Sequence, residues 1–272
     1  MLTAPAVLVT RPAAEGMGWV AELQARGISA EALPLIEIAP IADVLPAQAC
    51  WVELHTYASL MFVSGNAVEG FFAARPASVG AFHSGLRFMA PGPGTAKRLL
   101  RAGVPAAQID TPPHEAAQFD SQSLWEVVGQ RTWAGQRVLI VRGQSSVHVA
   151  QESLSDGAAP GRDWLARCLI DRGAAVDFVS VYQRRPPLLS RAAHDRVRRS
   201  QHDGSVWLFS SSEALAHLLA LPGLERMDWS QARAIATHPR IAQAAREAGW
   251  GVVIESRPAL ADIVASIESS FP

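Results

Sequence analysis

Short apolar runs alternate with longer stretches of helical periodicity along the chain. Four such runs are 7–10, 60–63, 138–141 and 206–209, and their apolar residues are consecutive, as in strands buried on both faces. Each run is followed by Ser or Arg and then by a helical stretch. The stretch after run 60–63 starts at about Asn66. Glycines, which favour the left-handed backbone after a helix, end such stretches at Gly27, Gly103, Gly173 and Gly249. The alternation predicts an α/β fold with parallel sheets flanked by helices.

The chain also resembles itself. Segment 7–11 matches 138–142 at an offset of 131, whereas 60–67 matches 207–214 at an offset of 147. Two similar halves predict two similar domains. The change of offset places about 15 extra residues within 143–163, where turn residues predict a surface excursion, whether ordered or disordered.

Composition narrows the class of protein. Hydrophobic residues make up 49% of the 272 and charged residues 18%, which supports a packed core, and the net charge of −1 argues against nucleic acid as a partner. Only Cys50 and Cys168 are present, so we expect two small buried side chains in a reducing cytoplasm. The N-terminus lacks the features of a signal peptide and no apolar run approaches 18 residues, so we expect no membrane span.

Residues that could bind a ligand lie where the predicted strands end and the helices begin. Ligands of open parallel sheets bind at the carboxyl ends of the strands, and helix N-termini offer free N–H groups to anions. Each such loop is also an ordinary helix cap, and only their recurrence at corresponding strand ends favours a binding site. The loops are 10–12, 64–66, 92–95, 142–143, 210–212 and 237–240.

Four side chains carry alternative interpretations. Arg11 and Arg142 occupy equivalent places in the repeat, where they could form a shared structural salt bridge or bind an anion. His238 could carry a proton or cap a helix. Tyr182 lies near the end of a strand that meets the basic segment 184–187, so its hydroxyl could face a cleft at a domain junction, or its ring could brace the linker.

Several familiar signatures are absent from the sequence. The segment 92–95 is neither a dinucleotide-binding glycine motif nor a phosphate loop, no nucleophile elbow is present, and the eight histidines are scattered without metal-ligand spacing. These absences disfavour a nucleotide-dependent enzyme of the doubly wound class. A non-catalytic two-domain binding protein for a polyanionic small molecule stays open as the alternative to an enzyme.

An ordered set of motifs resembles the uroporphyrinogen-III synthase family over nearly the whole chain. Segments 7–12 and 33–38 are similar to its N-terminus, Phe62-Val63-Ser64-Gly65-Asn66-Ala67-Val68 to its Phe-Thr-Ser-x-Asn-Ala-Val, and Gly92-Pro93-Gly94-Thr95-Ala96 to its Gly-x-x-Thr-Ala. The match continues in order through segments 119–124, 161–165, 173–176 and 181–184.

The resemblance implies a discontinuous domain of 1–36 plus 187–272, a second domain of 43–178, and antiparallel linker strands at 36–42 and 179–187. It implies that hydroxymethylbilane loses its terminal hydroxyl as water, inverts its last pyrrole ring and closes to uroporphyrinogen III. No cofactor or metal is implied. The partners would be this linear substrate with its eight carboxylates and, transiently, the preceding enzyme of the pathway, with a monomer as our default.

The resemblance also assigns roles to residues. Tyr182 matches the family tyrosine proposed to assist loss of the hydroxyl, and a phenol is a plausible donor but a modest acid. The predicted substrate-binding residues are Thr10, Arg11, Ser64, Asn66, Gly92, Thr95, Arg142, Gly143, Arg162, Ser210, Ser211, Ser212 and His238.

The sequence departs from the family pattern in three places. Val63 replaces a frequent threonine, and Ile241 fills another usual threonine position, where Arg240 or His238 could supply the missing donor instead. The third departure is the insertion of about 15 residues, which separates Arg142 from Arg162 and leaves open whether both arginines reach the cleft.

Overall fold

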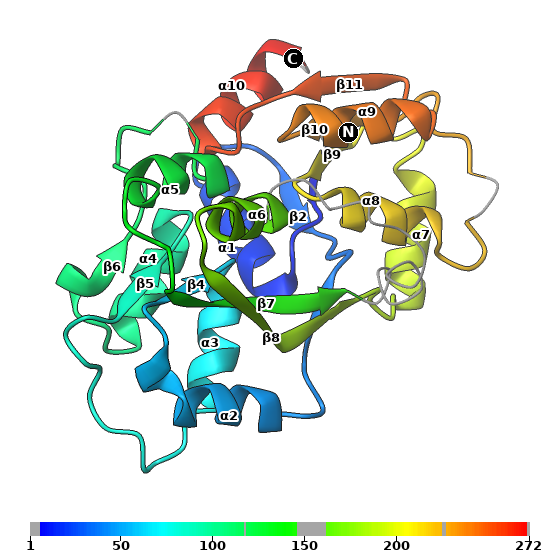
Figure 1. Ribbon diagram of the computed structural model, residues 1–272. Helices are drawn as coiled ribbons and strands as arrows, with labels where there is room; N and C mark the ends of the chain where they lie inside the picture. Colours follow the sequence, from blue (N-terminus) through cyan, green and yellow to red (C-terminus); the bar gives the residue numbers. More distant parts are fainter. Residues whose placement is uncertain (1–5, 117, 146–161, 225–226, 271–272) are drawn as a thin grey trace. The chain divides into compact units, whose positions relative to one another are not determined.

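The computed structural model describes residues 6–116, 118–145, 162–224 and 227–270, which form two compact units (Figure 1). One unit combines Met1–Glu37 with Arg185–Pro272, and the other is Ile38–Arg184. The predicted insertion falls largely on 146–161, outside the described residues. Within the described parts, no helix has the length and apolar character needed to cross a membrane.

The discontinuous unit is built on a parallel sheet in the order β11-β10-β9-β1-β2. Its strands are β1 (Val7–Val9), β2 (Ala30–Ala32), β9 (Val206–Phe209), β10 (Arg233–Ala236) and β11 (Val252–Glu255). Its helices are α1 (Ala13–Gln24), α7 (Arg191–Arg199), α8 (Ser212–Leu219), α9 (Pro239–Glu247) and α10 (Leu260–Ser270).

The continuous unit holds the sheet β3-β8-β7-β4-β5-β6, which is parallel except for one antiparallel pair. Its strands are β3 (Glu37–Pro40), β4 (Ser59–Phe62), β5 (Arg87–Met89), β6 (Ile109–Asp110), β7 (Arg137–Ser145) and β8 (Ala175–Arg185). Its α-helices are α2 (Leu45–Val52), α3 (Gly65–Ala73), α4 (Pro93–Arg101), α5 (Ser121–Val128) and α6 (Arg162–Asp171), with 3-10 turns at Leu54–Thr56 and Ala106–Gln108. The predicted α/β class with helix-flanked parallel sheets is confirmed.

Strand pairing shows how the two halves of the sequence combine. Val7 of β1 lies opposite Val206 of β9, and the matching pair in the other sheet is Val138 of β7 opposite Ser59 of β4. Each sheet therefore joins strands from both halves of the chain. The strand register agrees with the sequence repeat. Val7 and Val138 are equivalent at the offset of 131, and Ser59 and Val206 are equivalent at the offset of 147.

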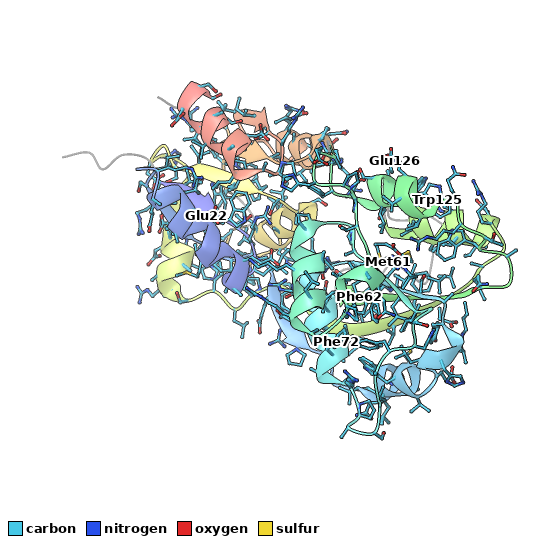
Figure 2. All side chains as sticks on the ribbon, turned by 90° about the vertical axis from the view of Figure 1, so that its left-hand side faces the viewer. Glu22, Met61, Phe62, Phe72, Trp125 and Glu126 are labelled. Atoms are coloured by element: carbon cyan, nitrogen blue, oxygen red, sulfur yellow. The ribbon has the colours of Figure 1, made fainter. Side chains whose placement is uncertain are left out.

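Alternate residues of β4 enter different cores, which is the period-two geometry of a strand. Phe62 packs with α2, α3 and α4, and its ring centroid is 6.2 Å from that of Phe72 on α3, whereas Met61 packs with α5 and α6 (Figure 2). Helices thus cover both faces of this sheet, which explains why 60–62 of β4 and 138–141 of β7 are consecutive apolar residues.

The predicted helix-ending glycines all adopt left-handed backbone. Gly27, Gly103, Gly173 and Gly249 have φ of 78°, 88°, 84° and 96°. A side chain would be strained at these angles, so the glycines serve to end helices and reverse the chain toward the next strand.

Candidate active site

The continuous unit brings together most of the predicted polar residues. Ser64 and Asn66 follow β4, and Gly92 and Thr95 follow β5, the next strand in the sheet. Tyr182 lies on β8, whose neighbour β7 lies next to β4 on its other side. Because β4, β5, β7 and β8 are parallel, these residues share the carboxyl edge of one sheet.

Tyr182 and Ser64 form the centre of this edge. The Tyr182 hydroxyl lies 3.1 Å from Oγ of Ser64, and either oxygen can be the donor. Ser64 also caps α3, since its Oγ accepts the N–H of Ala67 at 3.2 Å. With 5% of its surface exposed, Tyr182 is held in the apolar core of the unit, so its hydroxyl has a fixed position.

Arg142 and Gly143 do not form the loop at a strand end that their sequence predicts. The strand β7 continues to Ser145, with an irregularity at 142/143, where Arg142 lies opposite Ser180 but Gly143 lies opposite Tyr182. The prediction was wrong because β8 keeps pairing with β7 through Arg184, so the backbone remains extended past the glycine. Gly143 nevertheless lies against Tyr182, since a Cβ there would lie 2.3 Å from Cζ of that residue.

The two equivalent arginines have different surroundings. Arg11 lies 4.4 Å from the ring centroid of Trp19 and forms an ion pair of 3.7 Å with Glu15, and burial lowers its pKa although Glu15 opposes this effect. Arg142 lies 4.7 Å from the ring centroid of Phe178, and no carboxylate of the described residues lies within ion-pair distance of it. A salt bridge common to both repeats is therefore not seen.

The predicted residues of the discontinuous unit occupy the carboxyl edge of β1, β9 and β10. Thr10 is buried and donates its hydroxyl proton to the carbonyl of Leu208 at 2.8 Å, which ties the ends of β1 and β9 together. Ser210 lies between β9 and α8, Ser211 caps α8 by accepting the N–H of Glu213 at 3.2 Å, and Ser212 is the first residue of that helix.

His238 caps α9 through Nδ1 of its ring, and Nε2 takes no part in the cap. Its Nδ1 accepts the N–H of Arg240 at 3.1 Å, and both side chains are exposed beyond β10. Ile241 is buried at the place on α9 that Thr95 occupies on α4, so no hydroxyl is present there. Arg162 begins α6, but its side chain lies outside the described part of the structure.

Comparison with known proteins identifies the family. Residues 18–265 match the family of uroporphyrinogen-III synthase HemD. The chain belongs to the uroporphyrinogen-III synthase family. It is 28% identical over 256 residues to a uroporphyrinogen-III synthase of Salmonella typhimurium, covering 90% of this chain and 92% of that relative.

Solved structures of this family share the fold. A uroporphyrinogen III synthase mutant from the extremely thermophilic bacterium Thermus thermophilus superposes with a TM-score of 0.54 at 17% identity, covering 98% of both chains. The uroporphyrinogen-III synthetase of Helicobacter pylori 26695 gives 0.58 at 14% identity, covering 98% of this chain and 99% of that one.

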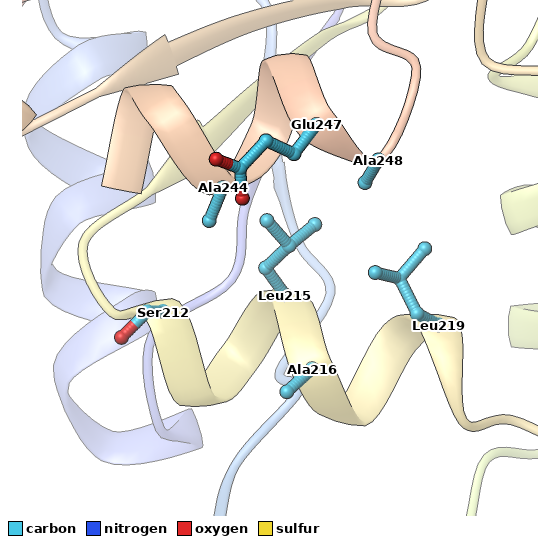
Figure 3. Close-up of a pocket in the computed structure, with 7 residues that line it drawn as sticks. All are labelled: Ser212, Leu215, Ala216, Leu219, Ala244, Glu247 and Ala248. Carbon is cyan, nitrogen blue, oxygen red and sulfur yellow. The ribbon is translucent and has the colours of Figure 1, made fainter. Parts of the chain in front are cut away.

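One pocket of the discontinuous unit involves a predicted residue. It measures about 320 Å³, lies between α8 and α9, and is lined by apolar side chains together with Ser212 and Glu247 (Figure 3). The carboxylate of Glu247 would repel a polycarboxylate such as the family's substrate. We therefore place no substrate carboxylate in this pocket.

Some charged residues of the continuous unit were not singled out by the sequence, namely Arg87, Arg98, Asp110 and Arg131. Gly65 and Arg98 lie against each other at the start of α3, next to Ser64. Asp110 at the end of β6 binds both Arg87 and Arg131. No local signal predicted either arrangement, because the partners come from separate strands and helices.

Proposed function

We propose that this chain acts as a uroporphyrinogen-III synthase through the carboxyl ends of the parallel strands in its sheets. It closes hydroxymethylbilane to uroporphyrinogen III with loss of water and inversion of the last pyrrole ring. Family membership over residues 18–265 supports the reaction, and the fixed Tyr182–Ser64 pair is the observation that supports a site at the strand ends. The reaction as proposed uses neither cofactor nor metal.

Holding the substrate in one geometry is the main task of such an enzyme. The uncatalysed closure gives the uninverted isomer, so the protein must favour attack at the substituted carbon of the last ring. A substrate with eight carboxylates offers many anchoring points to strand-end hydroxyls, free helix N–H groups and arginines. Ser64, Asn66, Gly92, Thr95 and Arg142 are the proposed contacts in the continuous unit.

The corresponding contacts in the discontinuous unit are proposed from the same chemistry. They are Arg11, Ser210, Ser211 and His238, with Thr10 and Ser212 as supporting residues. We further infer that 1–36 plus 187–272 and 43–178 act as two domains with linker strands at 36–42 and 179–187. Arg162 stays a proposed contact from its sequence motif alone.

Tyr182 is the proposed catalytic residue. As the bond between carbon and the terminal hydroxyl breaks, the phenol donates a hydrogen bond to the departing oxygen, which takes up a proton and leaves as water. The free pyrrole carbon that closes the ring later releases one proton, so the reaction balances as loss of one water. Ser64 holds the phenol in place, because its Oγ is fixed both to Tyr182 and to the start of α3. Positive charge that develops on the pyrrole system is then balanced by the substrate's own carboxylates.

The cellular setting is proposed from the chain's chemistry. We propose a cytoplasmic monomer that receives hydroxymethylbilane from the preceding enzyme of the pathway, in a transient contact. Both cysteines are free and half-buried, in keeping with a reducing compartment.

A coupled assay tests the proposal directly. Hydroxymethylbilane would be generated in place and given to the purified protein, and the oxidised products would be separated by chromatography. A large excess of isomer III over isomer I is the expected result. Isomer I alone from folded protein would contradict the synthase and favour a binding protein for polyanions, and saturable nucleotide binding would point to a different enzyme class.

A further inference from the structure

Arg98 is the cation that the fold places at the start of α3. Its side chain reaches from α4, and a Cβ on Gly65 would lie 1.7 Å from Nη1, 2.4 Å from Cδ and 2.5 Å from Cζ of Arg98. Only glycine leaves this space, so the guanidinium and the end of its aliphatic stem occupy the volume that a side chain at position 65 would fill.

Glu69 fixes one side of the guanidinium. Nε of Arg98 lies 3.0 Å from Oε1 of Glu69, whose side chain is 63% exposed. Among the described residues, the two terminal nitrogens of Arg98 have no hydrogen-bond partner. The side chain is thus oriented through Nε while its two terminal nitrogens stay available for an anion.

A cation at the start of α3 meets unfavourable partial charge, which its exposed partner Glu69 offsets only in part. The N-terminus of α3 already carries partial positive charge, and a guanidinium against its first residue adds to that charge. An exposed ion pair with Glu69 contributes little to stability. A carboxylate at this place would meet both the guanidinium and the first N–H groups of the helix.

Arg98 is also adjacent to the proposed catalytic pair. Gly65 follows Ser64 directly, and Ser64 Oγ is 3.1 Å from the Tyr182 hydroxyl. The series Arg98, Gly65, Ser64 and Tyr182 therefore runs without interruption along one edge of the sheet. A substrate group held by Arg98 would lie beside the phenol that assists loss of the hydroxyl.

We propose that Arg98 binds a carboxylate of the tetrapyrrole substrate and that Gly65 is required for this placement. The inference rests on the proposed function, because the ligand is the polycarboxylate that the reaction uses. Arg98 would act as a substrate-binding residue that positions the reacting end of the chain near Tyr182.

The test compares two variants that break the same ion pair. Arg98→Ala removes the cation and Glu69→Gln removes only its carboxylate partner, so a purely structural ion pair predicts the same effect from both. We expect Arg98→Ala to raise KM by roughly tenfold to a hundredfold, the loss of a charge-assisted hydrogen bond, while Glu69→Gln keeps KM within about twofold or lowers it. Arg101→Ala, on the exposed side of the same helix, is the matched control and should leave KM unchanged.

Gly65→Ala gives a second route to the same result. The new methyl group displaces the flexible arginine instead of the backbone, and alanine favours the helix, so stability should not fall. We expect the KM increase of Arg98→Ala to be reproduced, and the two changes together to be no worse than either one. An unchanged KM in both single variants, or equal increases in Arg98→Ala and Glu69→Gln, would overturn the proposal.

A binding measurement separates this inference from the proposed function. Uroporphyrin III, an octacarboxylate, would be titrated into wild type and Arg98→Ala while tryptophan fluorescence is followed. Weaker binding to the variant supports the carboxylate contact even if wild type forms no isomer III. Equal affinities would overturn the role of Arg98, whereas isomer I alone from wild type would overturn the synthase.

Discussion

Gly143 lies directly beneath the ring of Tyr182. A Cβ at position 143 would come within 2.3 Å of Cζ and 2.4 Å of Cε2, so the bare backbone of β7 forms the surface on which the ring rests. The irregularity at 142/143 places these two residues opposite each other in the sheet. The glycine and the change of register together set the position of the phenol, and through it the contact with Ser64.

Gly143→Ala should therefore damage activity through Tyr182. The added methyl group must push the ring away, which breaks its hydrogen bond with Ser64 and overpacks the core. We expect kcat to fall about tenfold and the free energy of unfolding to fall by about 1–3 kcal/mol. The coupled assay and urea unfolding measure the two effects.

Gly18→Ala provides the control for this substitution. Nothing lies within 4 Å of a Cβ at that exposed position of α1, so the change should keep activity and slightly stabilise the helix. Full activity of Gly143→Ala with unchanged stability would contradict the packing of Tyr182 on the glycine.

Tyr182→Phe should slow the reaction without abolishing it. The variant keeps the ring and its packing but loses the hydroxyl that assists departure of the leaving group. Because positioning carries most of the proposed rate enhancement, we expect kcat to fall about tenfold with little change in KM. The ratio of isomer III to isomer I should stay high.

Tyr57→Phe is the matched control, since both tyrosines are buried in the same core. Tyr57 lies just before β4, and its hydroxyl donates to the carboxylate of Asp177 on β8 at 3.2 Å. Loss of this hydrogen bond should lower the free energy of unfolding by about 1 kcal/mol and leave activity unchanged. A folded but inactive Tyr182→Phe would contradict a mainly positional mechanism.

Asp110 should make the stability of the protein sensitive to acid. Burial by itself would raise the pKa of this carboxyl, but hydrogen bonds from Arg131 and Arg87 outweigh burial and hold the pKa below its usual range. A carboxyl with a lowered pKa in the folded state stabilises the protein fully above about pH 4 and loses this contribution as the pH falls further.

Asp110→Asn should therefore destabilise the protein at pH 7 by about 2–3 kcal/mol, and the difference from wild type should shrink below about pH 4. Urea unfolding at several pH values measures this difference. Glu126→Gln, at an exposed position on α5 (Figure 2), is the control and should change stability by less than about 0.5 kcal/mol. If the difference in stability between wild type and Asp110→Asn grew as the pH fell below about 4, the pKa of Asp110 could not be lowered in the folded protein.

His238 or Arg240 should supply the donor that Ile241 lacks. We expect the double variant His238→Ala with Arg240→Ala to raise KM severalfold, because two exposed donors at the start of α9 are lost. His238→Asn keeps a helix cap and separates capping from binding. An unchanged rate and substrate affinity in the double variant would end this hypothesis.

Local signals in the sequence predicted the elements well. Gly27 and Gly173 end helices because the left-handed backbone of a single residue is enough to make the turn. The strands β1 and β9 are apolar throughout because both of their faces are covered. The prediction of a loop at Arg142 and Gly143 was wrong because the conformation there is decided by a distant strand and not by local residues. The continuation of the strand there depends on pairing with β8, more than 30 residues later in the chain.

The sequence by itself determined the α/β class, the repeat with its offsets, and the family, since consecutive apolar residues, caps and ordered motifs are written along the chain. The repeat alone did not determine which half pairs with which, because similar halves have similar strands, and it was the family resemblance that implied one domain built from both chain ends. Only the tertiary structure gave the order of the strands, with β1 directly beside β9 and β7 directly beside β4. The same packing placed Tyr182 against Gly143 and Ser64, and Arg98 over Gly65, since those contacts depend on how closely separate helices and strands approach one another.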